Sequence, residues 1–139
     1  MVQIIAGRKG KGKTKHLLDM ANSAIKGAKG TVVYLDKSSQ HMYELNNKVR
    51  LIDVTSYPVK NSDEFVGFIC GILSQDHDLE QIYLDSFLKI ARLEGLDIAS
   101  TLEQLDEIGK QFSVKFVISV SLDKEELPQS YTENVSVAL

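Results

Sequence analysis

Short hydrophobic runs alternate with longer amphipathic segments along this chain of 139 residues. The runs are rich in β-branched side chains and bounded by glycine or polar residues, which predicts buried β-strands. The segments between them repeat apolar residues every three or four positions, which predicts helices packed on one face. The pattern places strands at residues 2–6, 31–36, 48–54, 81–85, 114–121 and 134–139, and helices at 13–26, from 61 and from 100, with a short helix and loop over 87–99.

Local signals refine two of these helices. Asn61 and Ser100 each precede a glutamate by three residues, the spacing of a capping box, so we expect both to cap a helix. Cys70 is the only cysteine and lies among apolar residues, so we expect a buried structural thiol. It cannot form an internal disulfide, and the three histidines show no metal-ligand spacing.

The alternation of strands and helices predicts an α/β fold, a three-layer α/β/α sandwich with a mostly parallel sheet, in a single domain over residues 1–139. Ligands of such sheets bind beyond the carboxyl ends of the strands. The segments at those ends are 7–14, 36–38, 53–55, 85–86 and 119–123.

Composition and charge narrow the class of partner. The chain is 43% hydrophobic and 25% charged, and its net charge of -3 with no broad basic stretch gives no strong nucleic-acid signal. Its basic residues cluster between 8 and 15, which suits a small polyanion. No stretch approaches the ~20 apolar residues of a membrane span, and no signal-peptide pattern is present, so we expect a cytoplasmic protein.

Residues 7–14 read GRKGKGKT and match G-x-x-x-x-G-K-[ST] without a mismatch. Glycines allow backbone N–H groups to turn toward phosphates, and the following helix adds its positive dipole end. Lys13 can reach the β- and γ-phosphates, and the Thr14 hydroxyl can coordinate Mg²⁺. The motif therefore predicts binding of a nucleoside triphosphate. The predicted phosphate-contacting set is Gly7, Arg8, Lys9, Gly10, Lys11, Gly12, Lys13, Thr14 and Lys15, with a solvated role left open for Arg8, Lys9 and Lys11.

An aspartate at the end of a second buried strand usually supports the metal beside such a loop. Asp85 and Asp53 both end predicted strands. We favour Asp85, because its strand is flanked by two helical segments and is expected to be central. The alternative for either residue is a strand-end aspartate that caps the next loop, which is the first interpretation of Asp53.

With GRKGKGKT, VVYLD, IYLDS and ISVS in this order, the chain resembles small P-loop NTPases of the RecA/KaiC-like kind over residues 2–122. The resemblance implies Mg-ATP as ligand, with ATP preferred to GTP only because no Asn-Lys-x-Asp motif is present. It implies a sheet in which a sensor strand lies between the phosphate-loop strand and the strand ending at Asp85. Ser119 or Ser121 is then the candidate sensor of the γ-phosphate.

The chain departs from that family where catalysis is concerned. The family places a catalytic glutamate just beyond strand two, where this chain has Asp36 followed by Lys37. Asp36 is a candidate substitute, so the predicted catalytic set is Lys13, Asp85 and Asp36. A missing general base costs about 10²–10⁴-fold in rate, which favours weak or partner-dependent ATP hydrolysis.

Other functions stay open on the sequence. One is a nucleotide sensor or assembly subunit that does not hydrolyse ATP. Another is a small nucleoside or nucleotide kinase, disfavoured because the chain has only three arginines and no lid segment. Arg50 or Arg92 could serve as an arginine finger in a homo-oligomer, although a surface position is favoured for both.

Overall fold

The computed structural model describes residues 1–139 as six strands, four α-helices and three 3₁₀ helices. No helix has the length and apolar character needed to span a bilayer. The strands are β1 (Val2–Ala6), β2 (Thr31–Asp36), β3 (Arg50–Asp53), β4 (Leu79–Leu84), β5 (Lys115–Val120) and β6 (Val135–Ala138). The helices are α1 (Lys13–Gly27), α2 (Ser62–Ser74), α3 (Phe87–Ile90) and α4 (Ala99–Phe112), with 3₁₀ helices η1 (Val54–Ser56), η2 (Lys124–Glu126) and η3 (Gln129–Asn134).

All six strands belong to one sheet in the order β3-β2-β4-β5-β1-β6, and every neighbouring pair is parallel. The predicted α/β class is confirmed, and the sheet is parallel throughout. β5 lies between β1 and β4, which is the strand order expected for residues 114–121. The carboxyl ends of β1, β5, β4 and β2 therefore lie side by side at one edge of the sheet.

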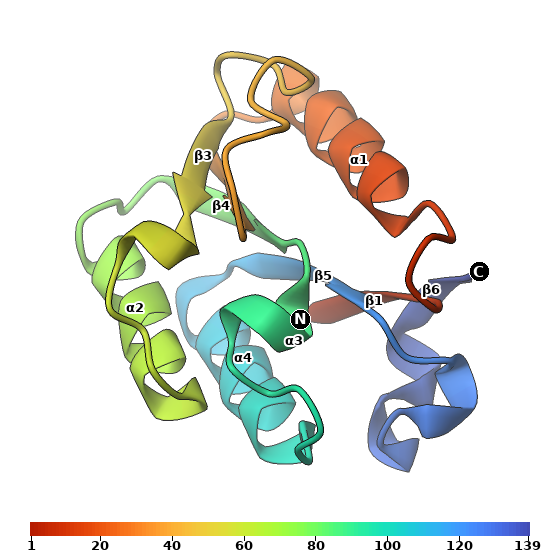
Figure 1. Cartoon of the computed structure of the whole chain (residues 1–139). Helices are drawn as coiled ribbons and strands as arrows, with labels where there is room; N and C mark the ends of the chain where they lie inside the picture. The colour runs from red at the N-terminus through yellow and green to blue at the C-terminus, as the bar shows by residue number, and fades with distance from the viewer.

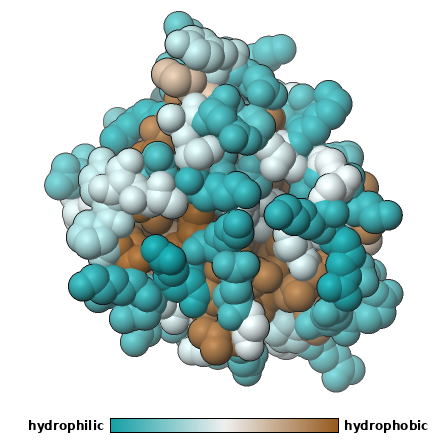
Figure 2. All heavy atoms as spheres, in the orientation of Figure 1, coloured by the Kyte–Doolittle hydropathy of each residue, from teal (hydrophilic) through white to brown (hydrophobic).

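Helices cover both faces of the sheet, with α1 on one face and α2, α3 and α4 on the other (Figure 1). Alternate residues of each strand point to opposite faces. In β2, for example, Val32 and Tyr34 join the core cluster under α1, whereas Val33 and Leu35 join the larger cluster under α2 and α4. Burial on both faces explains why the strands are nearly continuous hydrophobic runs. Hydrophilic side chains dominate the outer surface seen in Figure 2.

The edge strands are shorter than the pattern predicts. β3 covers Arg50–Asp53 instead of residues 48–54, because the chain turns into η1 at Val54. The Asp53 carboxylate caps that turn by accepting the backbone N–H of Thr55 at 2.9 Å. β6 forms the other edge and pairs with β1, after η2 and η3 have carried the chain across from β5.

The two predicted helix starts have different outcomes. Asn61 caps α2 as expected, since its side chain accepts the N–H of Glu64 at 2.9 Å. The expectation that Ser100 caps the next helix is wrong. α4 begins at Ala99, whose N–H is bound by the Asp97 carboxylate at 3.0 Å. Burial of Ile98 in the core places the first turn ahead of Ser100.

The expectation of a buried Cys70 is also wrong, because its side chain is exposed. α2 buries Phe65, Ile69 and Leu73, which are spaced four residues apart and share one face of the helix. Cys70 follows Ile69 by one residue and so points about 100° away from that face. Apolar neighbours in the sequence therefore did not predict burial, because successive residues of a helix point in directions about 100° apart.

Ile69 and Cys70 offer a matched pair of substitutions. Ile69→Ala should lower the free energy of unfolding by about 2–5 kcal/mol, because it opens a cavity in the core. Cys70→Ala should change it by less than about 0.5 kcal/mol, because the thiol is exposed. Urea denaturation followed by circular dichroism measures both. Equal losses for the two variants would contradict the packing described for α2.

Candidate functional site

The loop between β1 and α1 presents unpaired backbone donors. Gly10 and Gly12 have φ angles of 86° and 91°, a region that favours glycine. Gly12 is the N-cap of α1, and no side chain caps the helix. The N–H groups of Gly12, Lys13 and Thr14 accordingly have no protein acceptor. Together with the positive end of the helix dipole, these donors favour an anion at this position.

The side chain of Lys13 adds a positive charge to the same loop. It is 8% exposed, and its ammonium donates one hydrogen bond, to the Arg8 carbonyl oxygen at 3.0 Å. Burial lowers the pKa of Lys13, and the negative charge of Asp85 partly opposes that shift. A buried ammonium with one neutral partner is well placed to gain from an anionic ligand.

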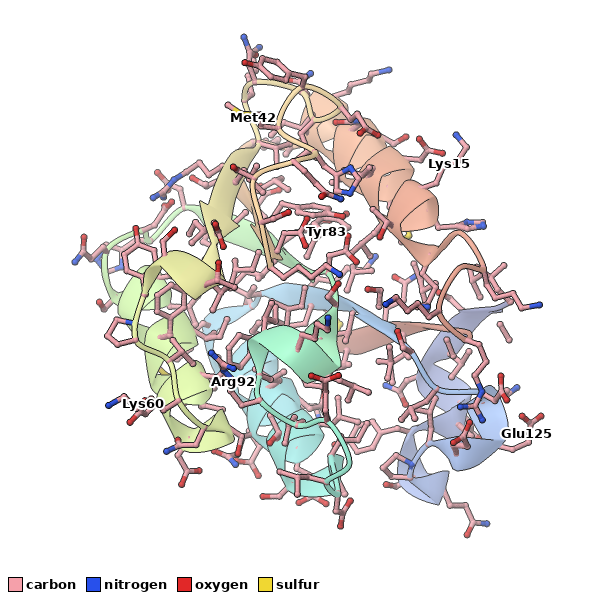
Figure 3. The ribbon with its side chains drawn as sticks, in the orientation of Figure 1. Lys15, Met42, Lys60, Tyr83, Arg92 and Glu125 are labelled. Carbon is pink, nitrogen blue, oxygen red and sulfur yellow. The ribbon has the colours of Figure 1, made fainter.

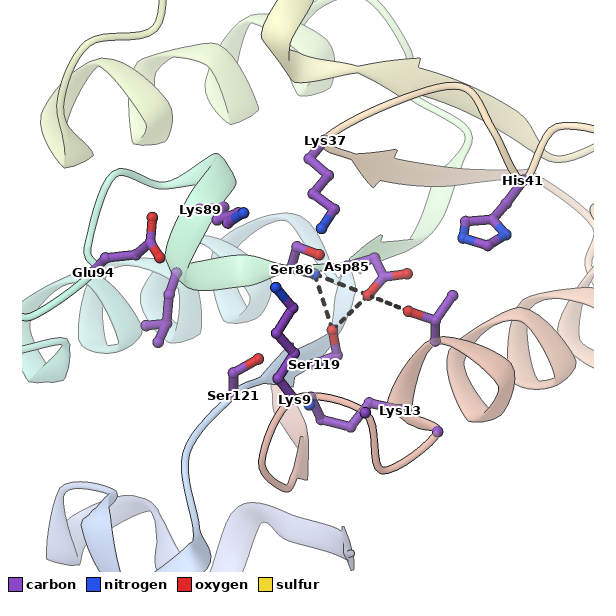
Figure 4. A pocket seen from close by; sticks show the side chains of 14 residues that line it. Lys9, Lys13, Lys37, His41, Asp85, Ser86, Lys89, Glu94, Ser119 and Ser121 are labelled. Carbon is purple, nitrogen blue, oxygen red and sulfur yellow. Dashed lines mark hydrogen bonds between the residues drawn. The ribbon is translucent and has the colours of Figure 1, made fainter.

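The carboxylate of Asp85 is the centre of the polar network shown in Figure 4. It lies just beyond β4 and is 2% exposed. Its Oδ1 accepts hydrogen bonds from Ser119 Oγ at 2.7 Å, the Ser86 N–H at 2.9 Å and Thr14 Oγ1 at 3.3 Å, and its Oδ2 accepts one from Tyr34 Oη at 2.7 Å. Two residues predicted as metal ligands, Thr14 and Asp85, are thus brought together.

The parallel register explains how this network forms. Leu84 pairs with Ile118 across β4 and β5, so Asp85 and Ser119 follow at neighbouring positions. Ser86 then adopts a left-handed conformation with φ of 54°, which costs a non-glycine residue about 1 kcal/mol. Its N–H donates to both Asp85 Oδ1 and Ser119 Oγ, which helps to offset that cost.

Tyr34 is a member of this network that sequence reasoning missed. It lies in the middle of β2 and stacks on Tyr83, with ring centroids 6.2 Å apart, inside the core under α1. Burial and the charge of Asp85 raise the pKa of Tyr34, so its phenol stays protonated and remains a donor. A usable signal was present, because a buried tyrosine hydroxyl normally needs a hydrogen-bond partner.

A cavity of about 560 Å³ opens above this network. Only one of its fourteen lining residues is hydrophobic, and its side chains include four lysines against two carboxylates. This excess of positive charge favours an anionic ligand. The lining residues are Lys9, Gly10, Gly12, Lys13, Thr14, Lys37, His41, Asp85, Ser86, Leu88, Lys89, Glu94, Ser119 and Ser121.

Three basic residues predicted to contact phosphate do not line this cavity. Arg8 forms ion pairs with Asp123 and Glu126 beside η2. Lys15 projects from the outer face of α1, where it pairs with Asp19 at 3.5 Å (Figure 3). Lys11 is exposed, and Gly7 lies beneath the loop, where its N–H donates to the Val120 carbonyl.

The structure separates the two aspartates that competed for the metal. Thr14 donates to Asp85, whereas Asp53 ends an edge strand and caps η1. The two candidate sensor serines also differ. Ser119 is buried and bound to Asp85, whereas Ser121 is exposed on the cavity wall.

Asp36 lies behind the cavity wall instead of on it. Its side chain is 2% exposed, its Oδ1 accepts the Lys37 N–H at 2.7 Å, and its Oδ2 has no hydrogen-bond partner. Burial, and then the charge of Asp85, raise the pKa of Asp36. The carboxylate proposed as a base from the sequence is therefore shielded from the cavity.

Arg50 and Arg92, the two candidate arginine fingers, are bound to other residues of the same chain. Arg50 pairs with Asp76 at 3.3 Å, and Arg92 Nε donates to the Val59 carbonyl at 3.1 Å. Neither lines the cavity that contains Asp85.

The oxygen atoms at the site fit Mg²⁺. The Thr14 hydroxyl and the Asp85 carboxylate are hard oxygen donors, which Mg²⁺ prefers. No group of three or more histidine, cysteine, aspartate or glutamate side chains could hold a metal ion alone. Mg²⁺ is usually held by one or two protein oxygens together with substrate phosphates and water, so two donors suffice.

Several cavity residues had not been assigned a function from the sequence. Lys37 follows β2 and Lys89 lies on α3, and both line the cavity. The end-of-strand rule identifies Lys37, but Lys89, His41 and Glu94 carry no comparable signal. Comparison of this chain with protein-family models and with curated proteins finds no match.

The burial of the Asp36 carboxylate leads to a prediction about how stability depends on pH. Asp36→Asn should stabilise the protein at neutral pH by about 1 kcal/mol or more, because it removes a buried charge with an unsatisfied oxygen. The raised pKa means that folded wild type binds this proton more tightly than the unfolded chain does. The stability that the folded protein gains from this tighter proton binding is therefore fully present below the ordinary pKa of 3.8. It is lost as pH rises through the raised pKa of Asp36.

The advantage of Asp36→Asn should consequently shrink as pH falls, because the wild-type carboxyl then becomes neutral. Urea denaturation at several pH values between 4 and 8 measures the difference. Asp19→Asn, at an exposed ion pair, serves as the control and should stay within about 0.5 kcal/mol of wild type. Destabilisation by Asp36→Asn at every pH would show that the carboxylate is favourably paired.

Proposed function

We propose that this protein binds a magnesium nucleoside triphosphate, most simply Mg-ATP, with residues 7–14 around the phosphates. The observation that carries the proposal is the hydrogen bond between Thr14 and Asp85, 71 positions apart in the sequence. An ordinary strand-turn-helix joint does not require a hydroxyl at the helix start to meet a buried carboxylate. A phosphate site that shares a metal requires both groups at one place.

The free donors of the loop support the same ligand. The N–H groups of Gly12, Lys13 and Thr14 have no acceptor, and the Lys13 ammonium has only a carbonyl. Phosphate oxygens would satisfy all of these donors at once and would bring negative charge to the helix terminus. This is the chemistry of a P-loop, and it supports the likeness to RecA-like NTPases.

Thr14 and Asp85 are the residues that would hold Mg²⁺, which neutralises phosphate charge when bound. Ser119, Tyr34 and the Ser86 N–H keep the Asp85 carboxylate oriented toward Thr14.

Slow or partner-dependent hydrolysis is the activity that fits this site best. No glutamate follows β2, and Asp36 lies behind the wall with its pKa raised. A poorly placed base leaves water activation weak. The same observation favours a second candidate, a nucleotide-dependent sensor that binds without turnover. Single-turnover phosphate release distinguishes the two.

Lys13 and Lys15 provide a matched test of binding. ATP with Mg²⁺ at about 100 times its Kd should stabilise wild type by about 2.7 kcal/mol, a rise of several degrees in Tm. Lys13→Ala should lose most of this shift, because the substitution removes the cation within the loop. Lys15→Ala should keep it, since that side chain pairs with Asp19 on the outer face of α1. Thermal denaturation measures all three proteins.

Each variant is compared with its own unliganded Tm, so that a change in fold stability does not count as lost binding. A nucleotide shift that survives Lys13→Ala would reject the proposed position of the phosphates. The absence of any shift in wild type with ATP, GTP or ADP would reject nucleotide binding altogether.

The metal assignment leads to a separate prediction. Thr14→Val and Asp85→Asn should weaken the apparent affinity for Mg²⁺ in the presence of ATP by about 10-fold or more. Asp53→Asn should leave it unchanged, because Asp53 caps η1 at the sheet edge. Magnesium titration of the ATP-dependent Tm shift, with EDTA as the zero point, gives these affinities. If only Asp53→Asn weakened the affinity for Mg²⁺, the metal ligand would be Asp53 instead of Asp85.

A further inference from the structure

Two lysines on the wall opposite the phosphate loop have no partner of their own. Lys37 follows β2 and is half-buried, and Lys89 is exposed on α3. Neither ammonium hydrogen-bonds to another group or lies within ion-pair distance of a carboxylate. Glu94 lines the same wall but pairs with neither lysine. Two cations thus line one wall of the cavity, and neither forms an ion pair within the chain.

Lys37 and Lys89 lie across the cavity from the loop between β1 and α1. In Figure 4 the side chain of Lys37 descends into the cavity toward Asp85 and Ser86, while Lys9 of the loop rises toward the same place. Lys89 lies beside Lys37 on the far wall. A ligand that reached from the N-terminus of α1 across Asp85 would end against these side chains.

The donors of the loop lie together at the start of α1. Gly12, Lys13 and Thr14 are grouped at the start of α1, at one end of the cavity. A triphosphate that continued from there across the cavity would bring its terminal phosphate toward the opposite wall, and a diphosphate lacks that third phosphate. The lysines of the opposite wall could therefore contact the third phosphate in addition to Lys13.

We propose that Lys37 and Lys89 bind the terminal phosphate of the triphosphate within the same chain, and so distinguish a triphosphate from a diphosphate. This inference rests on the proposed function and adds the residues that give it selectivity. Charge-assisted bonds from ammonium groups to phosphate oxygens supply the discrimination.

The arrangement also bears on whether a second subunit is needed. Transferring phosphoryl groups gain from a cation at the terminal oxygens, which is commonly an arginine from another chain. Here Arg50 and Arg92 are tied to Asp76 and Val59, whereas Lys37 already faces the site. The triphosphate preference should therefore be independent of protein concentration.

Isothermal titration of wild type, Lys37→Ala, Lys89→Ala and the double variant with Mg-ATP and Mg-ADP tests this inference. Lys37→Ala should weaken ATP binding by about 10-fold, the value of one hydrogen bond to a charged group. The exposed Lys89 should contribute less, about 3-fold, since water screens it. ADP affinity should change by less than about 2-fold in every variant, because the loop donors remain.

Lys60→Ala is the matched control, since Figure 3 shows Lys60 projecting into solvent beside α2, away from the cavity. It should leave both affinities unchanged. Lys37→Arg should restore most of the ATP preference, because it retains the positive charge. Circular dichroism verifies that each variant folds, which we expect because neither lysine packs in the core.

The outcomes separate this inference from the proposed function. Equal weakening of ATP and ADP in Lys37→Ala and Lys89→Ala, or no change in either, overturns the assignment of these lysines while nucleotide binding stands. An ATP preference that appears only at high protein concentration overturns it as well, in favour of a contact from another subunit. Failure of wild type to bind either nucleotide overturns both proposals.

Discussion

The buried carboxylate of Asp85 connects the fold to the site. It accepts hydrogen bonds from the start of α1, from β2 and from β5, in addition to the N–H of its own neighbour Ser86. A carboxylate that is 2% exposed is tolerable only because these donors compensate for its lost hydration. The donors meet there because β4 lies between β2 and β5, with α1 packed across the same edge. Compensation of this buried charge thus depends on the strand order.

The region around Asp85 also concentrates features that work against stability. Ser86 has a left-handed backbone, Asp36 has an unsatisfied buried oxygen, and three N–H groups at the start of α1 lack acceptors. The lysines of the cavity outnumber its carboxylates. Elsewhere, two well-packed clusters of buried hydrophobic residues lie on the two faces of the sheet. Such local costs are common at binding sites, where a ligand supplies the missing partners.

Much of the secondary structure follows from local sequence patterns. β1 and β2 have the predicted bounds, and α1 is one residue longer at its C-terminus. The errors occur where a local pattern competed with packing. Burial of Ile98 places the start of α4 ahead of the Ser100 capping signal. The rotation of α2 directs the Cys70 side chain away from the core. The shorter β3 reflects the cap that Asp53 forms for the next turn.

Hydrophobic periodicity and the GRKGKGKT motif were sufficient to establish an α/β sheet and to locate the loop, because both depend on residues close together in the chain. Only the tertiary structure decided that Asp85 and not Asp53 meets Thr14, that Tyr34 supports the same carboxylate, and that Asp36 lies behind the cavity wall. It also decided that Lys37 and Lys89 share one wall. These outcomes depend on which strands become neighbours, and that order arises from long-range packing of surfaces that local patterns do not encode.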